Sequence, residues 1–468
     1  MATRLTRLLP LAVLGWACST APSSPPEAET VERSEAAIVN GVRDTAHPAV
    51  VALLLGKDSS AGGACTGTIV KRDAARRIGW VATAAHCVDA GVALVLQTED
   101  YGAGDFIQYS VIDYEADPRY SRADLGHDFA IVRIGGVDAS TPVIPLTGDP
   151  DDLVEGMQVT SVGFGSTGSG VNTTRRSVKK PLDRVTPELL GYDQRGSGVC
   201  FGDSGGPVIA GSGASARVVG IHSFVAGGCD VEGYSARVTS GLDFYAQELE
   251  KVPEPSCAVC ETVATGGTGT CAELTTSCLN DDECRGYYEC IGDGKKDPAE
   301  CFSEFPISEG PFTAAKSCVC TQACADECVA EPSCAAVGKC GYKLDEDDAC
   351  TSCVESACCE EMRDCTVDGR CALCLKRKDS FGSCKRNTAR LALAACASDR
   401  CASECAGSTL QTIGETAPPE DADAGPPAPA EPASGCSLAP SAPDAPVAWR
   451  SLAISGLALA AFARRRRR

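Results

Sequence analysis

Short apolar runs rich in Val, Leu, Ile and Ala recur through the first half of the chain. They occupy residues 49–55, 92–97 and 130–134. Runs of this length favour strands, because branched apolar side chains fit the pleated surface of a sheet. We therefore expect each run to form a β-strand.

The second half follows a different pattern, in which cysteine takes the place of large apolar residues. Of the 30 cysteines in the chain, 24 lie between residues 257 and 405. Spacings of three and four residues, as in 323–330 and 390–406, place cysteines on one face of a helix. Because few large side chains are available for a core, we expect short helices and helical hairpins held by disulfides.

The cysteine spacing also predicts an internal duplication of residues 256–405. Three cysteines recur at an offset of 81 residues, and two flanking pairs recur beside them: Cys278, Cys284 and Cys290 with Cys359, Cys365 and Cys371, Cys257 and Cys260 with Cys350 and Cys353, and Cys324 and Cys328 with Cys401 and Cys405. The even number predicts complete pairing and leaves the connectivity open. Zinc binding and redox catalysis are the alternatives for the CxxC pairs, but no histidine follows residue 222.

Composition narrows the partners and the compartment. A chain of 468 residues has room for roughly two to four domains. The net charge of −21 argues against a nucleic-acid partner, because phosphate binding needs a basic face. Thirty cysteines are hard to keep reduced, so we expect an oxidising compartment.

The start of the chain predicts export. Residues 1–17 combine a basic start, an apolar middle over 8–14 and small residues after it, as in a signal peptide. Lipidation of Cys18 is an alternative to ordinary cleavage nearby.

The C-terminal region predicts a spacer followed by an envelope signal. Residues 406–434 are rich in Pro, Ala and acidic residues and are expected to be an extended linker. Residues 435–468 contain Cys436, an apolar segment and a terminal run of arginines. A plain membrane anchor is one interpretation. The order of parts resembles the myxobacterial C-terminal sorting signal (MYXO-CTERM type), which implies processing near Cys436 and display on the bacterial cell surface.

Three motifs indicate the chemistry of the first half. They contain His86 in AAHC, Asp128 in HDFA and Ser204 in GDSGGP. A serine hydroxyl is a poor nucleophile until a base takes its proton, and the pKa of histidine suits that task. A buried carboxylate fixes the imidazole tautomer. The other histidines, His47, His127 and His222, are interpreted as structural.

These motifs, in the order His, Asp, Ser, make residues 38–252 resemble the chymotrypsin-like (trypsin-fold) serine proteases. The resemblance implies that His86 is the general base, Asp128 its orienting partner and Ser204 the nucleophile. It also implies two antiparallel β-barrels with the site between them. The expected fold class is therefore all-β, followed by a disulfide-rich, mainly helical duplicated module.

The same resemblance assigns supporting roles around the triad. The backbone N–H groups of Gly202 and Ser204 would form the oxyanion hole, and Ser223 would support the aspartate. Residues 223–225 would pair with the substrate backbone as an added strand. Two disulfides are implied: Cys65–Cys87 and Cys200–Cys229.

The segment IVNG at Ile38 resembles the activation site of this family. Cleavage before Ile38 would free an α-amino group that pairs with Asp203, and residues 18–37 would be a propeptide. The residue before the cut is Ala37, where the family usually has Arg. A pocket for small residues would allow the enzyme to cut its own junction.

The primary substrate pocket is expected to be small and apolar. In the family its floor lies at the position of Gly198, where binding of Arg or Lys would require a carboxylate. The segment GVCFGDSG resembles that of the leukocyte elastases, and Val225 would block an aromatic ring. The pocket residues implied by the resemblance are Gly198, Val199, Ser223, Phe224, Val225 and Gly233.

Together these features predict an exported, surface-anchored serine endopeptidase that cleaves proteins or peptides after small aliphatic residues. We expect no cofactor and no metal, and the partner of the cysteine-rich module is left open. A surface binding or adhesion protein with a latent protease domain is the alternative. A processing enzyme with one native substrate is a third interpretation.

Overall fold

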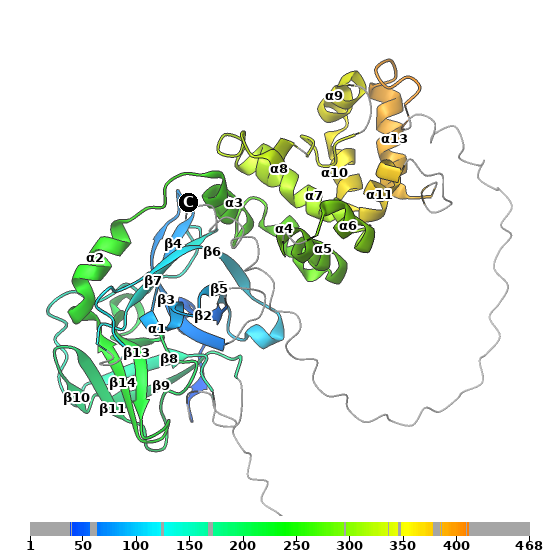
Figure 1. The fold of residues 1–468 in the computed structure, drawn as a ribbon. Helices are drawn as coiled ribbons and strands as arrows, with labels where there is room; N and C mark the ends of the chain where they lie inside the picture. Colours follow the sequence, from blue (N-terminus) through cyan, green and yellow to red (C-terminus); the bar gives the residue numbers. More distant parts are fainter. Residues whose placement is uncertain are drawn as a thin grey trace, which may run out of the picture. The chain divides into compact units, whose positions relative to one another are not determined.

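The computed structural model describes residues 38, 40–56, 63–122, 126–166, 172–293, 296–335, 337–344, 348–377, 384, 386–408 and 410 (Figure 1). The predicted signal peptide, propeptide and C-terminal signal, and nearly all of the predicted linker, lie outside these residues. Within the described part, no helix is long and apolar enough to cross a membrane.

Six antiparallel strands of the first half close into a barrel in the order β2-β3-β4-β7-β6-β5. All three predicted runs are strands here, as β2, β5 and β7, and their apolar side chains are buried in a common core. The barrel strands are β2 Val50–Leu55, β3 Gly63–Asp73, β4 Ile78–Thr83, β5 Val92–Gln97, β6 Ile107–Ala116 and β7 Ala130–Gly135.

Eight further strands form a second antiparallel sheet, in the order β1-β9-β8-β12-β13-β14-β11-β10. Among the described residues no pairing joins β1 to β10. The structure thus has one closed barrel and one eight-stranded sheet where two barrels were expected. The strands are β1 Val42–Arg43, β8 Gln158–Gly163, β9 Arg176–Pro181, β10 Arg184–Val185, β11 Leu189–Asp193, β12 Pro207–Ala210, β13 Arg217–Ala226 and β14 Glu232–Arg237.

Helix α2, Leu242–Glu250, packs back on the barrel. The buried guanidinium of Arg133 on β7 donates to Glu248 Oε2 at 3.1 Å. This ion pair, together with buried Phe244 and Tyr245, fixes the helix against β7, which begins two residues after Asp128.

The second half is helical, so the all-β label holds only for the first half. Few large apolar side chains are buried in it, and cysteines make up much of its core. Its elements are α3 Cys257–Thr265, α4 Ala272–Asn280, α5 Asp282–Asp293, α6 Pro298–Glu304, α7 Glu309–Cys318, the π-helical turn η4 Val319–Ala323, α8 Pro332–Ala335, α9 Asp348–Ala357, α10 Cys359–Val367, α11 Gly369–Arg377 and α13 Thr388–Arg400.

The predicted helix over 390–406 corresponds to α13, which ends at Arg400 and continues as turns. The predicted helix over 323–330 is wrong. The backbone leaves helical geometry at Cys324, where φ is −129° and ψ is 35°, and residues 325–330 form turns. Here two disulfides to α3, rather than helical spacing, hold the cysteines.

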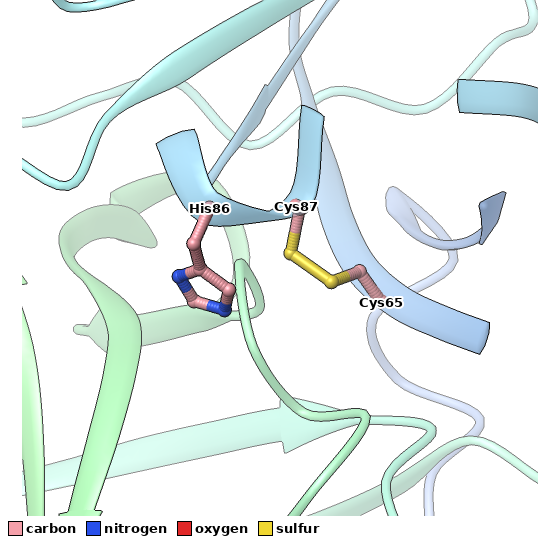
Figure 2. A group of neighbouring side chains, drawn as sticks. All are labelled: Cys65, His86 and Cys87. Carbon is pink, nitrogen blue, oxygen red and sulfur yellow. A yellow bond between two sulfur atoms is a disulfide. The ribbon is translucent and has the colours of Figure 1, made fainter. Parts of the chain in front are cut away.

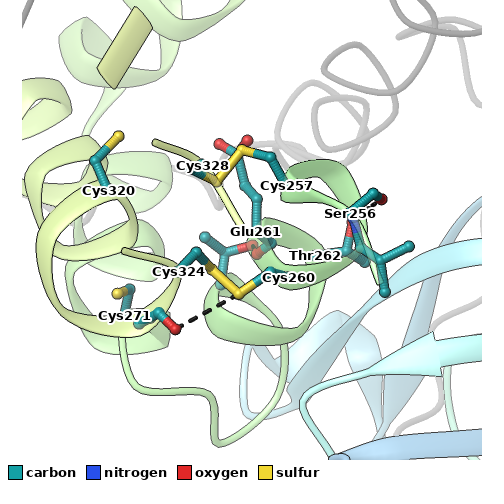
Figure 3. Close-up of a disulfide and its surroundings, with 12 residues drawn as sticks. Ser256, Cys257, Cys260, Glu261, Thr262, Cys271, Cys320, Cys324 and Cys328 are labelled. Carbon is teal, nitrogen blue, oxygen red and sulfur yellow. Dashed lines mark hydrogen bonds between the residues drawn. A yellow bond between two sulfur atoms is a disulfide. The ribbon is translucent and has the colours of Figure 1, made fainter. Parts of the chain in front are cut away.

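Twelve disulfides pair all 24 cysteines of the module, which confirms complete pairing. In the first repeat of the module, Cys257–Cys328 and Cys260–Cys324 join α3 to the turns after η4 (Figure 3). In the second repeat of the module, Cys350–Cys405 and Cys353–Cys401 join α9 to the turns after α13. The duplication therefore extends to the connectivity.

The predicted offset of 81 residues is wrong. Disulfide Cys278–Cys284 corresponds to Cys365–Cys371, at an offset of 87. Cys359, which the prediction aligned with Cys278, pairs with Cys340 instead. Cys359 to Cys365 and Cys365 to Cys371 are both steps of six residues, so the spacing alone allows two registers.

Candidate active site

His86 lies on the one-turn helix α1, Ala85–Val88, which follows the buried strand β4. The adjacent Cys87 forms a disulfide with Cys65 on β3, so the helix is fixed to the barrel wall. Figure 2 shows the imidazole projecting from α1 beside this disulfide. Cys65, His86 and Cys87 are close enough to hold a metal ion, but both sulfurs are in the disulfide and offer no thiolate.

Asp128 lies two residues before β7 and its side chain is fully buried. Its Oδ2 accepts a hydrogen bond from His86 Nδ1 at 2.8 Å, and its Oδ1 accepts one from the His86 backbone N–H at 3.0 Å. Ser223 Oγ on β13 donates to the same Oδ2 at 2.5 Å. Because the carboxylate can only accept, the proton of neutral His86 stays on Nδ1 and its Nε2 is left with a free lone pair.

Ser204 lies in the loop that enters β12. Its carbonyl accepts a hydrogen bond from the Thr66 N–H at 2.8 Å, and the disulfide-bonded Cys87 Sγ lies 3.6 Å from the same oxygen. Its backbone therefore lies against the residue that follows His86. The barrel supplies His86 and Asp128, whereas the eight-stranded sheet and its loops supply Ser204 and Ser223.

The loop also arranges its own amide groups. The N–H groups of Asp203, Gly205 and Gly206 donate to the carbonyls of Cys200, His222 and Asp203, respectively. In the described part of the chain the N–H groups of Gly202 and Ser204 have no acceptor. Gly202 has a φ of +98°, which favours glycine, and a Cβ there would lie 3.0 Å from Gly165 Cα.

Asp203 is fully buried beside Gly163 and Gly165, and a Cβ on either glycine would collide with its carboxylate. The carboxylate accepts hydrogen bonds from the N–H of Gly165 at 2.7 Å and of Cys200 at 2.8 Å. Burial raises the pKa of Asp203 to about 7, and these two backbone hydrogen bonds oppose the rise. Ile38 is also fully buried.

The predicted pocket residues come from two segments that flank Ser204. The Cys200–Cys229 disulfide joins the segment before Ser204 to the loop after β13. Val225 on β13 pairs with Gly233 on β14. Phe224 stacks on Tyr234 with ring centroids 4.8 Å apart.

Sequence reasoning missed Gln194, which follows β11 and is fully buried. Its side chain packs against Gly198 and Gly233. No sequence motif contains this glutamine. Only the turn between Gln194 and Ser197, which brings the chain back to Gly198, places it beside the predicted pocket.

His222 is buried, as expected for a structural histidine. Its Nδ1 forms hydrogen bonds with Tyr192 Oη at 2.8 Å and Ser235 Oγ at 3.0 Å. Burial lowers the pKa of His222 to about 3, which the Pro207 backbone opposes. The imidazole is therefore neutral near pH 7.

Comparisons with known proteins concern the first half of the chain. Residues 38–244 match the family model described as Trypsin. Brachyurin from Leptuca pugilator is 29% identical over an alignment of 212 residues, and the match covers 40% of this chain and 89% of brachyurin. Coagulation factor XI from Bos taurus is 24% identical over an alignment of 206 residues, and the match covers 38% of this chain and 32% of factor XI.

Two solved structures also match, one of HBP and one of human heparin binding protein. Each is 19% identical with a TM-score of 0.39, and they cover 46% and 47% of this chain and 98% and 100% of their own chains. The family match and the two relatives agree with the site described above. Residues 38–244 form a trypsin-family domain, and the protein is a serine-type endopeptidase.

Proposed function

We propose that His86, Asp128 and Ser204 hydrolyse peptide bonds through an acyl-enzyme. The observation that supports this most directly is the position of Asp128, whose carboxylate accepts hydrogen bonds from His86 Nδ1 and Ser223 Oγ. Three donors on one buried carboxylate, counting the His86 backbone N–H, hold the imidazole in one orientation.

In the proposed reaction, His86 Nε2 takes the proton from Ser204 Oγ as the oxygen bonds to the scissile carbonyl carbon. The negative charge on the carbonyl oxygen is stabilised by the N–H groups of Gly202 and Ser204. His86 then gives its proton to the leaving amine, and the C–N bond breaks. A water molecule, activated by the same histidine, hydrolyses the ester and restores Ser204.

The pocket favours small aliphatic side chains before the cut. Gly198 carries no charge to bind Arg or Lys, and Val225 places two methyl groups opposite Gly233. Exclusion of a methylene or two is worth about 1–3 kcal/mol, so the preference is real but graded. Ser223 to Val225 is the segment we assign to pairing with the substrate backbone.

Activation depends on a new amino group at Ile38. In the unprocessed chain the buried Asp203 carboxylate has two backbone donors and a raised pKa. An ammonium beside it would offset its burial and hold the oxyanion loop in one conformation. Ala37 before the cut fits the small pocket, so we propose that the enzyme processes its own junction.

The rest of the chain suits an exported enzyme. Disulfides hold the module together in place of a large apolar core, as in small secreted domains. We propose that the C-terminal segment displays the enzyme at the cell surface and that the module separates the protease from that anchor.

Cleavage-site profiling tests the substrate preference. A mixture of peptides would be digested with the processed enzyme and with a Ser204→Ala control, and the products sequenced by mass spectrometry. Cuts after Ala and Val, absent with the control, would support the proposal. Cuts mainly after Arg or Phe would refute the small pocket while leaving the serine mechanism intact.

A further inference from the structure

Gln194 occupies a position that the proposed mechanism does not use. It is fully buried, and its amide is saturated by backbone groups. Its Oε1 accepts a hydrogen bond from the Val199 N–H at 2.6 Å. Its Nε2 donates to the carbonyl of Val199 at 3.1 Å and to that of Cys229 at 3.2 Å. These bonds connect the segment before Ser204 to the loop after β13.

The side chain lies between the two glycines assigned to the pocket. A Cβ on Gly198 would lie 2.6 Å from Gln194 Cδ, and a Cβ on Gly233 would lie 2.6 Å from Gln194 Oε1. A side chain at residue 198 would project from the pocket floor. The space that such a side chain would enter is therefore filled by Gln194.

We propose that Gln194 is a specificity-determining residue that closes the floor of the substrate pocket and limits its depth. This inference rests on the proposed function and names the residue that sets its preference. Ala, Val or another short side chain would end above the glutamine amide. A longer side chain would have to displace an amide that has three hydrogen bonds.

The amide also makes the floor electrically neutral. Both Nε2 hydrogens are used by backbone carbonyls, so Gln194 has no donor left for a substrate carboxylate. It has no charge to pair with an ammonium or guanidinium. The floor therefore disfavours acidic as well as basic side chains, which would be buried without a partner.

The residues packed behind Gln194 support this closed floor. Tyr192 packs against Gly233, and its hydroxyl forms hydrogen bonds with Ser235 Oγ at 2.7 Å and with His222. Because Tyr192, Ser235 and His222 are themselves buried and hydrogen-bonded, displacement of Gln194 away from the pocket would require a rearrangement of β11 and β14.

Two substitutions test the proposal in the processed full-length enzyme. Gln194→Gly removes the amide and deepens the pocket, whereas Gln194→Met keeps a similar volume without the hydrogen bonds. We would measure kcat/KM for peptides that differ only in Ala, Leu or Phe before the cut, normalised by active-site titration. We expect Gln194→Gly to raise the Leu-to-Ala ratio by roughly 10-fold or more, and Gln194→Met to change it less than about 3-fold.

An unchanged ratio in a Gln194→Gly enzyme that titrates normally would overturn the proposal. A straight-chain series on the unaltered enzyme covers the case in which the variants do not fold. With Ala, norvaline and norleucine before the cut, kcat/KM should fall roughly 10-fold or more by norleucine. A rate that stays level or rises through norleucine would also overturn it. Failure of the proposed function would differ, because the unaltered enzyme would then cleave none of these peptides.

Discussion

Ser223 Oγ donates a hydrogen bond of 2.5 Å to the same Asp128 oxygen that accepts from His86 Nδ1. A strand of the eight-stranded sheet therefore holds the orienting group of a histidine that belongs to the barrel. This bond couples the alignment of the proposed catalytic base to the strand that we assign to substrate pairing.

Loss of this bond should slow the reaction without weakening substrate binding. In Ser223→Ala the Asp128 carboxylate loses a donor, at a cost of about 1.5–3 kcal/mol for a hydrogen bond to a charged group. We expect kcat to fall roughly 10- to 100-fold with little change in KM. Steady-state kinetics would measure both. Ser317→Ala, which removes a buried hydroxyl in the module, is the control and should leave both unchanged. A parallel rise in KM would contradict the orienting role.

Replacement of Gly202 should remove most of the activity. Alanine disfavours a φ of +98°, and its Cβ would crowd Gly165 Cα. The loop must then shift and misdirect the N–H groups of Gly202 and Ser204. Loss of one oxyanion donor costs about 10²–10³ in kcat. Gly104→Ala is the matched control, since Gly104 also has a positive φ of +78° but no neighbouring atom within 4 Å of the added Cβ. Comparable losses in both variants would show a general folding defect.

The buried Asp203 should make the stability of the unprocessed chain depend on pH. Its pKa is about 7 in the folded chain and near 3.9 when unfolded, so the folded state holds more protons between these values. The free energy of unfolding should therefore fall as pH rises from about 4 to about 7, by at most about 1.4 kcal/mol per pH unit. Denaturant unfolding of unprocessed Ser204→Ala protein would measure this slope.

Two comparisons isolate the contribution of Asp203. In unprocessed Asp203→Asn/Ser204→Ala protein the slope should become smaller, whatever the change in absolute stability. In processed protein the Ile38 ammonium should lower the pKa of Asp203 and remove the fall. Equal slopes in all three proteins would contradict the assignment of Asp203 as the buried acid that awaits a cation.

The disulfides of the module should contribute unequally. Cys260–Cys324 closes a separation of 64 residues, whereas Cys278–Cys284 closes one of 6. Loop-closure entropy then predicts that Ser substitution of the first pair costs about 2 kcal/mol more than that of the second. Calorimetry of the module transition in the full chain would compare them. Turnover by the protease domain should be the same in both variants, and equal stability losses would refute the entropic account.

The sequence predicted local features of the fold well. The expected strand over 92–97 coincides with β5, and those over 49–55 and 130–134 differ from β2 and β7 by one residue. These strands are buried at nearly every position, so each leaves a strong signal as a continuous apolar run. The closure of a second barrel depends on pairing between distant strands, which no short run determines.

The motifs that we propose to be catalytic were recognisable because His86, Asp128 and Ser204 each lie in a distinctive local segment. Gln194 was missed because its role depends on two glycines, Gly198 and Gly233, that meet it only after β11 and β14 pair. The repeat register was misjudged for a similar reason, because equal spacings at Cys359, Cys365 and Cys371 fit two alignments. Only the disulfide partners of these cysteines distinguish the two alignments.

Active-site labelling tests the central claim most directly. The protein with a free Ile38 would be treated with a fluorophosphonate probe beside an identically prepared Ser204→Ala variant, and the labelled peptide would be identified by mass spectrometry. Our account predicts stoichiometric labelling on Ser204 that competes with an Ala-ending peptide substrate and is absent in the variant. No labelling of the folded, processed protein, or equal labelling of both, would contradict it.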